Sequence, residues 1–162
     1  DPDGGVDWLS IGTDPNAPDD GWFDTFMNRV DALVMGRASF EKVVSFGVWP
    51  YSKPVLVRSR TMNAVPDGYE DKASVISGSP HEIVSSLSKS GIHRLYVDGG
   101  KTAQAFLDAD LIDEMVIAYV PVLLGKGIPL FGSLAHPLEF RHLETQTLSI
   151  GLAQSRYERA RQ

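Results

Sequence analysis

The residues with the clearest chemical potential lie at 98–102, where an apolar run ends in Asp-Gly-Gly-Lys-Thr. Paired glycines let a backbone approach a ligand closely, and the N–H groups at the start of a helix carry partial positive charge that suits a phosphate. Thr102 adds a hydroxyl group. Asp98 would repel a phosphate, so we assign it to capping the following helix or to bonding loop amides. The alternative is a tight strand-to-helix turn that binds no ligand.

A second segment of this kind lies at 35–41, with the sequence Met-Gly-Arg-Ala-Ser-Phe-Glu. Here Gly36 ends an apolar run, and Arg37 falls in the first turn of the helix that we expect next. A cation at that end of a helix is unfavourable with the helix dipole, and an anionic ligand would remove the conflict. The alternative is an arginine that is simply solvated.

A third apolar run ends at 57–61 in Val-Arg-Ser-Arg-Thr. Sites specific for NAD place an acidic residue at such a strand end to hold the ribose hydroxyls, whereas basic and hydroxyl groups there suit the 2′-phosphate of NADP. The alternative is a polar surface loop. Three phosphate-compatible strand ends in one sheet favour a dinucleotide site more than any single one, although the GxGxxG and Walker patterns are both absent.

Alternating strands and helices must position these segments. The periodicity predicts an amphipathic helix over 22–30, and further helices carrying Phe40 to Val44, running from a Ser79 cap to about Gly91, and opening at Gly99. Short apolar runs predict buried strands at 32–35, 55–57, 74–76, 95–97 and 115–120. Loops are expected at 1–21 and 45–53, and a hairpin after Leu143 that turns at 149–151. This order predicts an α/β fold with a mostly parallel central sheet, helices on both faces and an antiparallel C-terminal hairpin.

Composition limits the remaining function classes. The chain has 162 residues, so we expect a single domain over 1–162, and its net charge of -6 argues against nucleic acid as the main partner. There are no cysteines, and the four histidines lack metal-ligand spacing, so we expect no metal site. The longest uncharged apolar stretch, 115–125, contains Pro121 and is shorter than the roughly 20 residues that a membrane helix needs. We therefore expect a soluble, cytoplasmic protein without membrane partners.

The ordered motifs closely resemble the RibD C-terminal reductase family, which shares the three-layer dihydrofolate reductase fold. The resemblance covers nearly the whole chain and rests on seven segments: 6–9, 31–41, 49–50, 59–61, 95–102, 106–107 and 121–131. It implies NADPH as cofactor, bound by three groups of residues: Gly36, Arg37 and Ser39; Ser59, Arg60 and Thr61; and Gly99, Gly100, Lys101 and Thr102.

The resemblance also implies a reaction. The named reaction of the family reduces the ribose of a phosphoribosylamino-pyrimidine to ribitol, so we expect an NADPH-dependent reductase of a pterin-like or ribosylamino-pyrimidine substrate. The alternatives are an NADP(H)-binding protein of the same fold without turnover, and a phosphate-binding module unrelated to NADPH. The family makes a homodimer plausible, and 121–131 could form a substrate-side loop or a subunit contact.

The resemblance is least informative on the substrate side. Dihydrofolate reductases use an acid near the start of the helix equivalent to 22–30, so Asp20 and Asp24 are candidate proton donors, with an N-cap and a solvated surface residue as the respective alternatives. Trp22 and Trp49 are candidates for an aromatic slot that holds the substrate, with core packing as the alternative. Family members begin with a central strand upstream of residue 1, so we expect roughly 15 further N-terminal residues.

Overall fold

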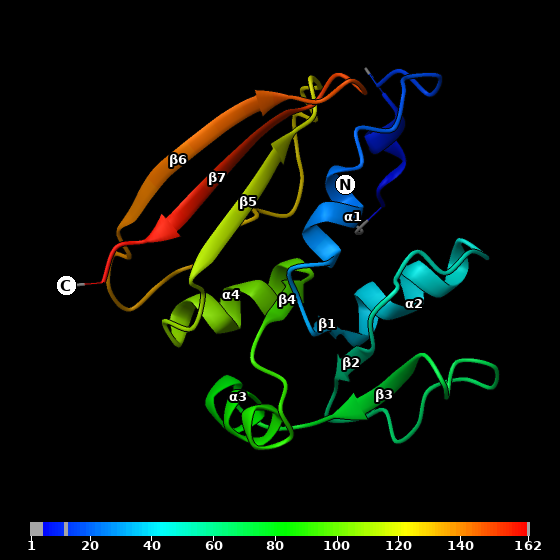
Figure 1. The fold of residues 1–162 in the computed structure, drawn as a ribbon, viewed down its shortest axis with the longest axis vertical. Coiled ribbons are helices and arrows are strands. Elements are labelled where there is room, and N and C mark those ends of the chain that lie inside the picture. Colours follow the sequence, from blue (N-terminus) through cyan, green and yellow to red (C-terminus); the bar gives the residue numbers. More distant parts are fainter. Residues whose placement is uncertain (1–4, 12, 162) are drawn as a thin grey trace. The chain divides into compact units, whose positions relative to one another are not determined.

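The computed structural model describes residues 5–11 and 13–161 (Figure 1). The chain divides into two compact units, Phe23–Leu111 and the unit formed by Asp1–Trp22 with Ile112–Gln162, which are described one at a time. Whether they act as the single domain expected over 1–162 stays a prediction. Within the described ranges, no helix is both long enough and apolar enough to cross a membrane.

A four-stranded parallel sheet is the centre of the unit Phe23–Leu111. It contains β1 (Ala32–Gly36), β2 (Val55–Arg58), β3 (Ala73–Ile76) and β4 (Leu95–Asp98) in the order β3-β2-β1-β4. Residues 32–35 of β1 are all completely buried, as expected for an uninterrupted apolar run in a sheet that is covered on both faces. The predicted parallel sheet is confirmed, with strand ends within two residues of those expected.

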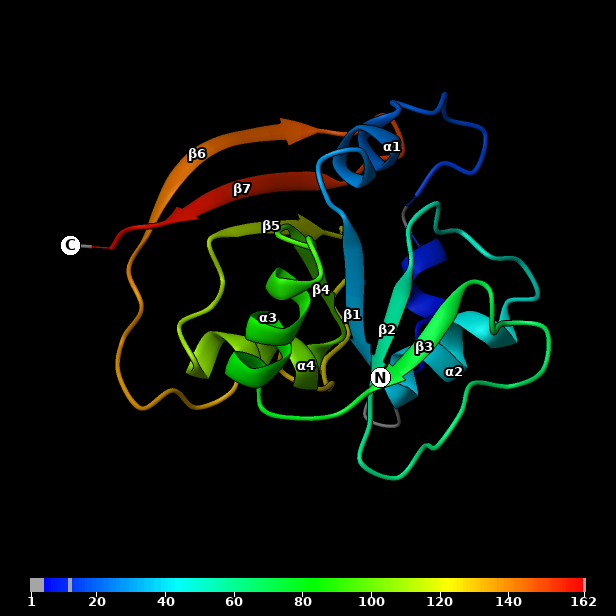
Figure 2. The same cartoon turned by 60° about the horizontal axis from the view of Figure 1, so that its bottom comes forward.

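Helices cover both faces of this sheet. The connection from β1 to β2 runs one way across the sheet through α2 (Arg37–Ser45), and the connection from β3 to β4 returns through α3 (Pro80–Lys89). Because such crossovers are right-handed, opposite directions place these helices on opposite faces. Figures 1 and 2 show α2 on one face, with α3 and α4 (Gly100–Asp108) on the other. The predicted three-layer arrangement is therefore present within this unit.

The predicted start of α3 is confirmed in detail. Ser79 is the N-cap, and its hydroxyl accepts a hydrogen bond from the Glu82 N–H at 3.3 Å. The Glu82 carboxylate in turn accepts from the Ser79 N–H at 2.8 Å, and Pro80 occupies the first turn. This capping box satisfies two N–H groups that a helix start otherwise leaves without partners.

The helix predicted over 22–30 is shorter in the structure, where α1 spans Trp22–Met27. The chain must leave the helix early because it enters β1 at once: the N–H of Asp31 donates to the Arg94 carbonyl oxygen at 2.8 Å. The Asp31 carboxylate fixes this entry by accepting from the N–H groups of His93 and Arg94, both at 2.9 Å. Val30 lies beyond the helix and is nevertheless buried in the core.

The second unit is built on a three-stranded antiparallel sheet. Its strands are β5 (Glu114–Tyr119), β6 (Phe140–Thr147) and β7 (Ala153–Arg159), in the order β5-β7-β6. The predicted C-terminal hairpin is confirmed, and the structure adds β5 to its sheet. The loop expected over 1–21 is corrected, because Asp7–Ser10 forms a short 3-10 helix, η1, and the Trp8 indole donates to the Gly5 carbonyl oxygen at 3.1 Å.

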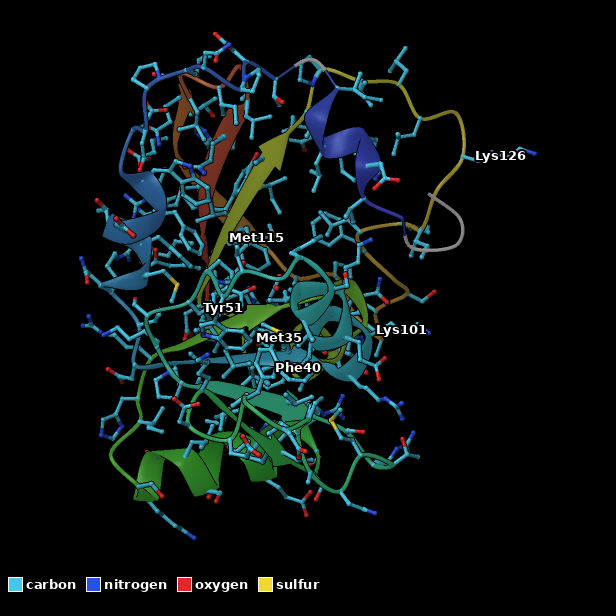
Figure 3. The ribbon with its side chains drawn as sticks, turned by 90° about the vertical axis from the view of Figure 1, so that its right-hand side faces the viewer. Met35, Phe40, Tyr51, Lys101, Met115 and Lys126 are labelled. Carbon is cyan, nitrogen blue, oxygen red and sulfur yellow. The ribbon has the colours of Figure 1, made fainter. Side chains whose placement is uncertain are left out.

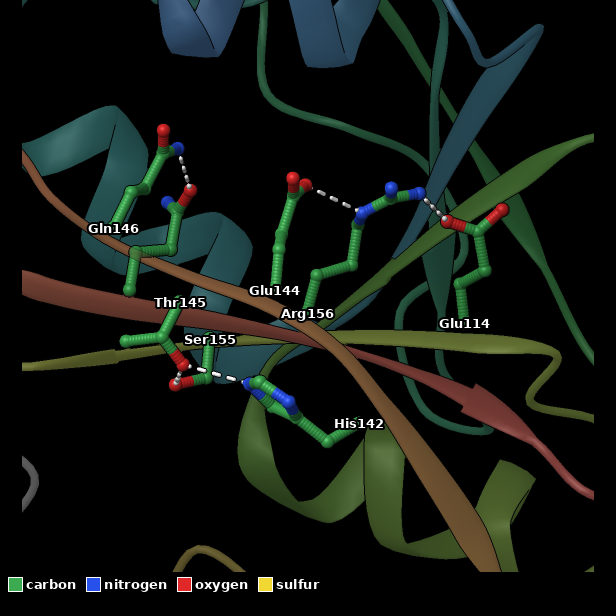
Figure 4. Close-up of polar contacts among 8 residues, drawn as sticks. Glu114, His142, Glu144, Thr145, Gln146, Ser155 and Arg156 are labelled. Carbon is green, nitrogen blue, oxygen red and sulfur yellow. Dashed lines mark hydrogen bonds and ion pairs between the residues drawn. The ribbon is translucent and has the colours of Figure 1, made fainter.

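Strand β6 is exposed along almost its whole length, and polar pairs join its side chains to β7 (Figure 4). The hydroxyl oxygens of Thr145 and Ser155 are hydrogen-bonded at 2.8 Å, and the Gln146 side-chain amide donates a hydrogen bond to the Gln154 side-chain oxygen at 3.0 Å. Arg156 pairs with Glu144 across the strands. Such polar cross-strand pairs stabilise a strand whose side chains face water.

Candidate cofactor site

The three segments singled out by sequence follow three neighbouring strands of the parallel sheet. In the register of the sheet, Gly36 lies beside Arg58, and Met35 lies beside Asp98. The segments that follow β2, β1 and β4 therefore begin at one edge of the sheet, with β1 in the middle. In open α/β sheets, this carboxyl edge is where ligands bind.

Two glycines let the starts of α2 and α4 approach each other here. A Cβ atom on Gly99 would lie 2.2 Å from the Ser39 hydroxyl oxygen, and one on Gly36 would lie 3.0 Å from the Thr102 hydroxyl oxygen. Gly99 also has φ +85°, a conformation that other residues rarely adopt. The close approaches are reciprocal, since each glycine lies beside a side chain of the other helix, and they allow the two helix starts to lie close together.

Neither helix start carries a side-chain cap among the residues that the structure describes. The N-cap residues are Gly36 for α2 and Gly99 for α4, and neither helix start has a hydrogen bond from its N–H groups to a capping side chain. The first N–H groups of a helix without such a cap are suited to bind an anion. The capping role predicted for Asp98 is wrong, because Gly99 takes the cap position. Its alternative role, bonding loop amides, is not found among the described residues, where the Asp98 carboxylate accepts a hydrogen bond from the Tyr96 hydroxyl at 3.4 Å.

Each of the two helix starts carries one positive side chain in its first turn, Arg37 in α2 and Lys101 in α4. Arg37 forms an ion pair with Glu41 one turn further along α2, at 2.6 Å, and about half of each side chain is exposed. Glu41 thus offsets the unfavourable position of this cation, so the conflict with the helix dipole does not by itself require a ligand. Exposed pairs of this kind contribute little to stability, which leaves the guanidinium available to an anion. Lys101 lies in the first turn of α4, where it is exposed (Figure 3).

The segment after β2 is shaped by Ser59 rather than left as an irregular loop. The Ser59 hydroxyl accepts hydrogen bonds from the N–H groups of Thr61 at 3.2 Å and Met62 at 3.0 Å. This turn leaves the side chains of Arg60 and Thr61 exposed. Ser59 therefore acts on the backbone of the turn, and Arg60 and Thr61 are the residues offered to a ligand.

The residues predicted for the substrate side fall in both units. Asp20 belongs to the unit with the antiparallel sheet, where its carboxylate accepts from the Ser149 N–H at 2.7 Å and the Ser149 hydroxyl at 2.5 Å. Both hydrogen bonds lower the pKa of Asp20, and the one from the Ser149 hydroxyl has the larger effect. Asp20 is thus hydrogen-bonded to the β6–β7 turn, and its alternative role as the N-cap of α1 stays a prediction. Asp24 is exposed in the first turn of α1.

Trp49 lies within a cluster of aromatic rings in the unit Phe23–Leu111. Its ring centroid is 5.5 Å from that of Tyr51 and 5.5 Å from that of Tyr69, and 6.2 Å from that of Phe40. All four side chains belong to the core cluster that contains Met35 or pack against it. Figure 3 labels Met35, Phe40 and Tyr51 of this group. The packing alternative for Trp49 thus has structural support, and its role toward a substrate stays a prediction. Trp22 is half-buried at the end of the other unit, and its role is likewise a prediction.

Sequence reasoning missed two tyrosines near Asp98. Burial, and then the charge of Asp98, raises the pKa of Tyr51 to about 12. Burial raises the pKa of Tyr96 still further, assisted by Asp98 and Tyr51. Both hydroxyls therefore keep their protons at neutral pH. The alternation of β4 could have placed Tyr96 beside Asp98, but Tyr51 comes from a loop whose path no local pattern indicates.

No group of three or more potential ligands that could hold a metal ion is present within residues 5–11 and 13–161.

Comparison with known proteins places this arrangement in a family. The family described as "RibD C-terminal domain" matches residues 3–153. The chain belongs to the RibD C-terminal domain family. The expected resemblance is confirmed, and with it the fold.

Individual relatives agree with this assignment. The crystal structure of a candidate riboflavin biosynthesis protein from Shewanella sp. PV-4 is 48% identical to this chain, covers 99% of it and 91% of its own length, and superposes with a TM-score of 0.92. "Uncharacterized protein YwjB" of Bacillus subtilis is 30% identical over 142 residues, which are 86% of this chain and 78% of the relative. Dihydrofolate reductase from Enterococcus faecalis, solved in complex with NADP(H), shares the fold with a TM-score of 0.60 at 16% identity, over 87% of this chain and 82% of its own.

Proposed function

We propose that this protein is an NADPH-dependent reductase acting on a pterin-like or ribosylamino-pyrimidine substrate, as in riboflavin-type chemistry. One observation carries the proposal. Helices α2 and α4, whose N-caps are glycines without a capping side chain, begin close together at the carboxyl ends of the strands. The turn that exposes Arg60 and Thr61 follows the neighbouring strand at the same end of the sheet. Membership of the RibD C-terminal domain family supports a reductase in general, and the fold is shared with an enzyme solved with NADP(H).

The residues at this edge match the chemistry of the cofactor. The N–H groups at the starts of α2 and α4 would bind the pyrophosphate, with the Thr102 hydroxyl and the Lys101 ammonium group beside them. Arg60 and Thr61 would bind the 2′-phosphate, because a guanidinium forms strong, charge-assisted hydrogen bonds with phosphate oxygens. Arg37 would add a second positive charge once its exposed pair with Glu41 opens. When bound, NADPH would supply the hydride for the reduction.

The protein's own contribution would be orientation. The contacts that join Gly36 to Thr102 and Gly99 to Ser39 fix the spacing of the two helix starts, so a dinucleotide would meet donors that are already in place. Asp24 is the candidate proton donor that remains, because the lowered pKa of Asp20 favours its ionised form, which has no proton to donate.

Binding of reduced nucleotides tests the cofactor assignment. We expect Arg60→Ala in the full-length protein to weaken NADPH by about 10- to 100-fold, the effect of losing a charge-assisted contact, and to leave NADH within about twofold. Arg94→Ala is the matched control, because Arg94 precedes β4 at the opposite, amino edge of the sheet. Equal losses for NADPH and NADH would contradict the assignment of the 2′-phosphate to Arg60.

Turnover is tested separately. NADPH oxidation on addition of the phosphoribosylamino-pyrimidine intermediate or of dihydrofolate is the expected result. NADPH binding without oxidation of either compound would instead support a binding protein of the same fold, and absence of NADPH binding would support a phosphate-binding module. The homodimer expected from the family stays a prediction.

A further inference from the structure

A carboxylate and two tyrosine hydroxyls gather on one face of the parallel sheet, close to the proposed cofactor edge. Tyr96 and Asp98 are two residues apart in β4, so their side chains point to the same face. Their neighbours in the register are Leu33 and Met35, both members of the buried core cluster. Asp98 therefore lies on the face covered by α2, directly before the glycine that starts α4.

The surroundings of Asp98 are aromatic rather than ionic. Tyr96 packs edge-on against Phe26 with ring centroids 4.9 Å apart, and Tyr51 packs against Trp49 at 5.5 Å and Phe23 at 6.4 Å. In the part of the chain that the structure describes, no ion pair involving Asp98 is present, and its side chain has the single hydrogen bond from Tyr96, to Oδ1. A half-buried carboxylate of this kind is costly unless a donor meets its second oxygen.

Nothing in the fold of this unit requires a carboxylate at that position. Asp98 does not cap α4, and the polar entry to β4 is already fixed by Asp31 at the other end of the strand. Its position beside the Gly99 turn makes it a near neighbour of anything bound at the starts of α2 and α4. A negative charge there is unfavourable for a phosphate and favourable for a ligand that presents N–H donors.

We propose that Asp98, flanked by Tyr51 and Tyr96, is the substrate-recognition residue, accepting hydrogen bonds from the ring N–H and amino groups of a flat nitrogen heterocycle. Tyr96 occupies Oδ1 and orients the carboxylate, which leaves Oδ2 as an acceptor for the ligand. Tyr51 keeps its proton at neutral pH and donates to a ring carbonyl or ring nitrogen. The surrounding aromatic rings provide a stacking surface for the heterocycle.

This inference deepens the proposed function, on which it rests for the adjacent cofactor, and calorimetry on the full-length protein tests it. The probe is 5,6-diaminouracil, a flat heterocycle with ring N–H and amino donors, titrated with and without saturating NADPH. We expect Asp98→Asn to weaken the probe at least tenfold, because an amide presents a donor where the carboxylate presents an acceptor, and Tyr51→Phe to weaken it several-fold. The matched control is Tyr69→Phe, a tyrosine of the same aromatic cluster, which should leave probe affinity unchanged.

Separate NADPH titrations distinguish this inference from the proposed function. We expect Asp98→Asn to keep the thermal stability of the wild type and to bind NADPH at least as tightly, because the variant removes a negative charge that is unfavourable for a phosphate. Unchanged probe affinity in Asp98→Asn, an equal loss of NADPH and probe affinity, or a wild-type protein that binds no probe at millimolar concentration would each overturn the inference. If the wild-type protein binds the probe through Asp98 but does not bind NADPH, the proposed cofactor fails and the recognition role of Asp98 stands.

Discussion

Replacing Gly99 by alanine tests the geometry of the paired helix starts most directly. Two costs add at this position. The φ of +85° is unfavourable for an L-residue by about 1–3 kcal/mol. The new Cβ would also lie 2.2 Å from the Ser39 hydroxyl oxygen, so that side chain must leave its rotamer, at roughly 0.5–1.5 kcal/mol. We therefore expect Gly99→Ala to lower the free energy of unfolding by about 2–4 kcal/mol.

The neighbouring glycine is a matched control. A Cβ on Gly100 would meet nothing within 4 Å, and this residue is the first of α4 with a helical backbone. Gly100→Ala should therefore leave the stability unchanged or raise it by about 0.5–1 kcal/mol, because alanine restricts the unfolded chain. The assay is denaturant unfolding followed by tryptophan fluorescence, with NADPH affinity measured on the same samples.

A double variant separates the two costs. Ser39→Ala removes the hydroxyl that lies 2.2 Å from the new atom but keeps its own Cβ at 3.3 Å. Added to Gly99→Ala, it should restore about 1 kcal/mol and leave the backbone strain in place. Equal effects of alanine at positions 99 and 100, or full recovery in the double variant, would refute the reasoning.

Two further predictions concern the two units separately. Asp20→Asn should lower the thermal stability at pH 7, because the carboxylate accepts both Ser149 hydrogen bonds. Folding lowers the pKa of Asp20, so the wild type is the more stable protein at any pH above the pKa of Asp20 in the unfolded chain. This advantage is lost as the pH falls through the pKa of Asp20 in the folded protein. Melting curves from pH 7 to about pH 3 check this, and a constant difference between the two proteins would contradict it. Phe40→Ala, at a completely buried position, should cost about 3–5 kcal/mol in urea unfolding, and a loss below about 1 kcal/mol would show that Phe40 is not part of a close-packed core.

The parallel part of the fold was predictable because its signals are local. The run at 32–35 is apolar without interruption, as a strand buried on both faces requires, and the Ser79–Glu82 capping box marks the start of α3 within one residue. The hairpin after Leu143 was equally recognisable. The end of α1 was not, because Val30 continues the apolar spacing, while hydrogen bonds to residues 93 and 94 draw the chain into β1.

The candidate site was only partly predictable for the same reason. Glycine, arginine and hydroxyl residues at strand ends are local patterns, and the register of the sheet brings them to one edge. The roles of Asp20 and Asp98 depend on partners that no local pattern indicates: Asp20 bonds a residue 129 positions away, and Asp98 is grouped with a tyrosine from a distant loop. A carboxylate before a helix resembles a cap in sequence whether or not it acts as one.

The reciprocal contacts between α2 and α4 have an evolutionary consequence. Positions 39 and 99 share one small volume, and positions 36 and 102 share another, so the size of either residue in a pair limits the size of the other. A relative that carries a larger residue in place of Gly36 should compensate with a smaller one at the position of Thr102. Distant members of the family that keep this helix-to-helix approach should therefore be recognisable by correlated replacements at these two pairs, even where no single position is invariant.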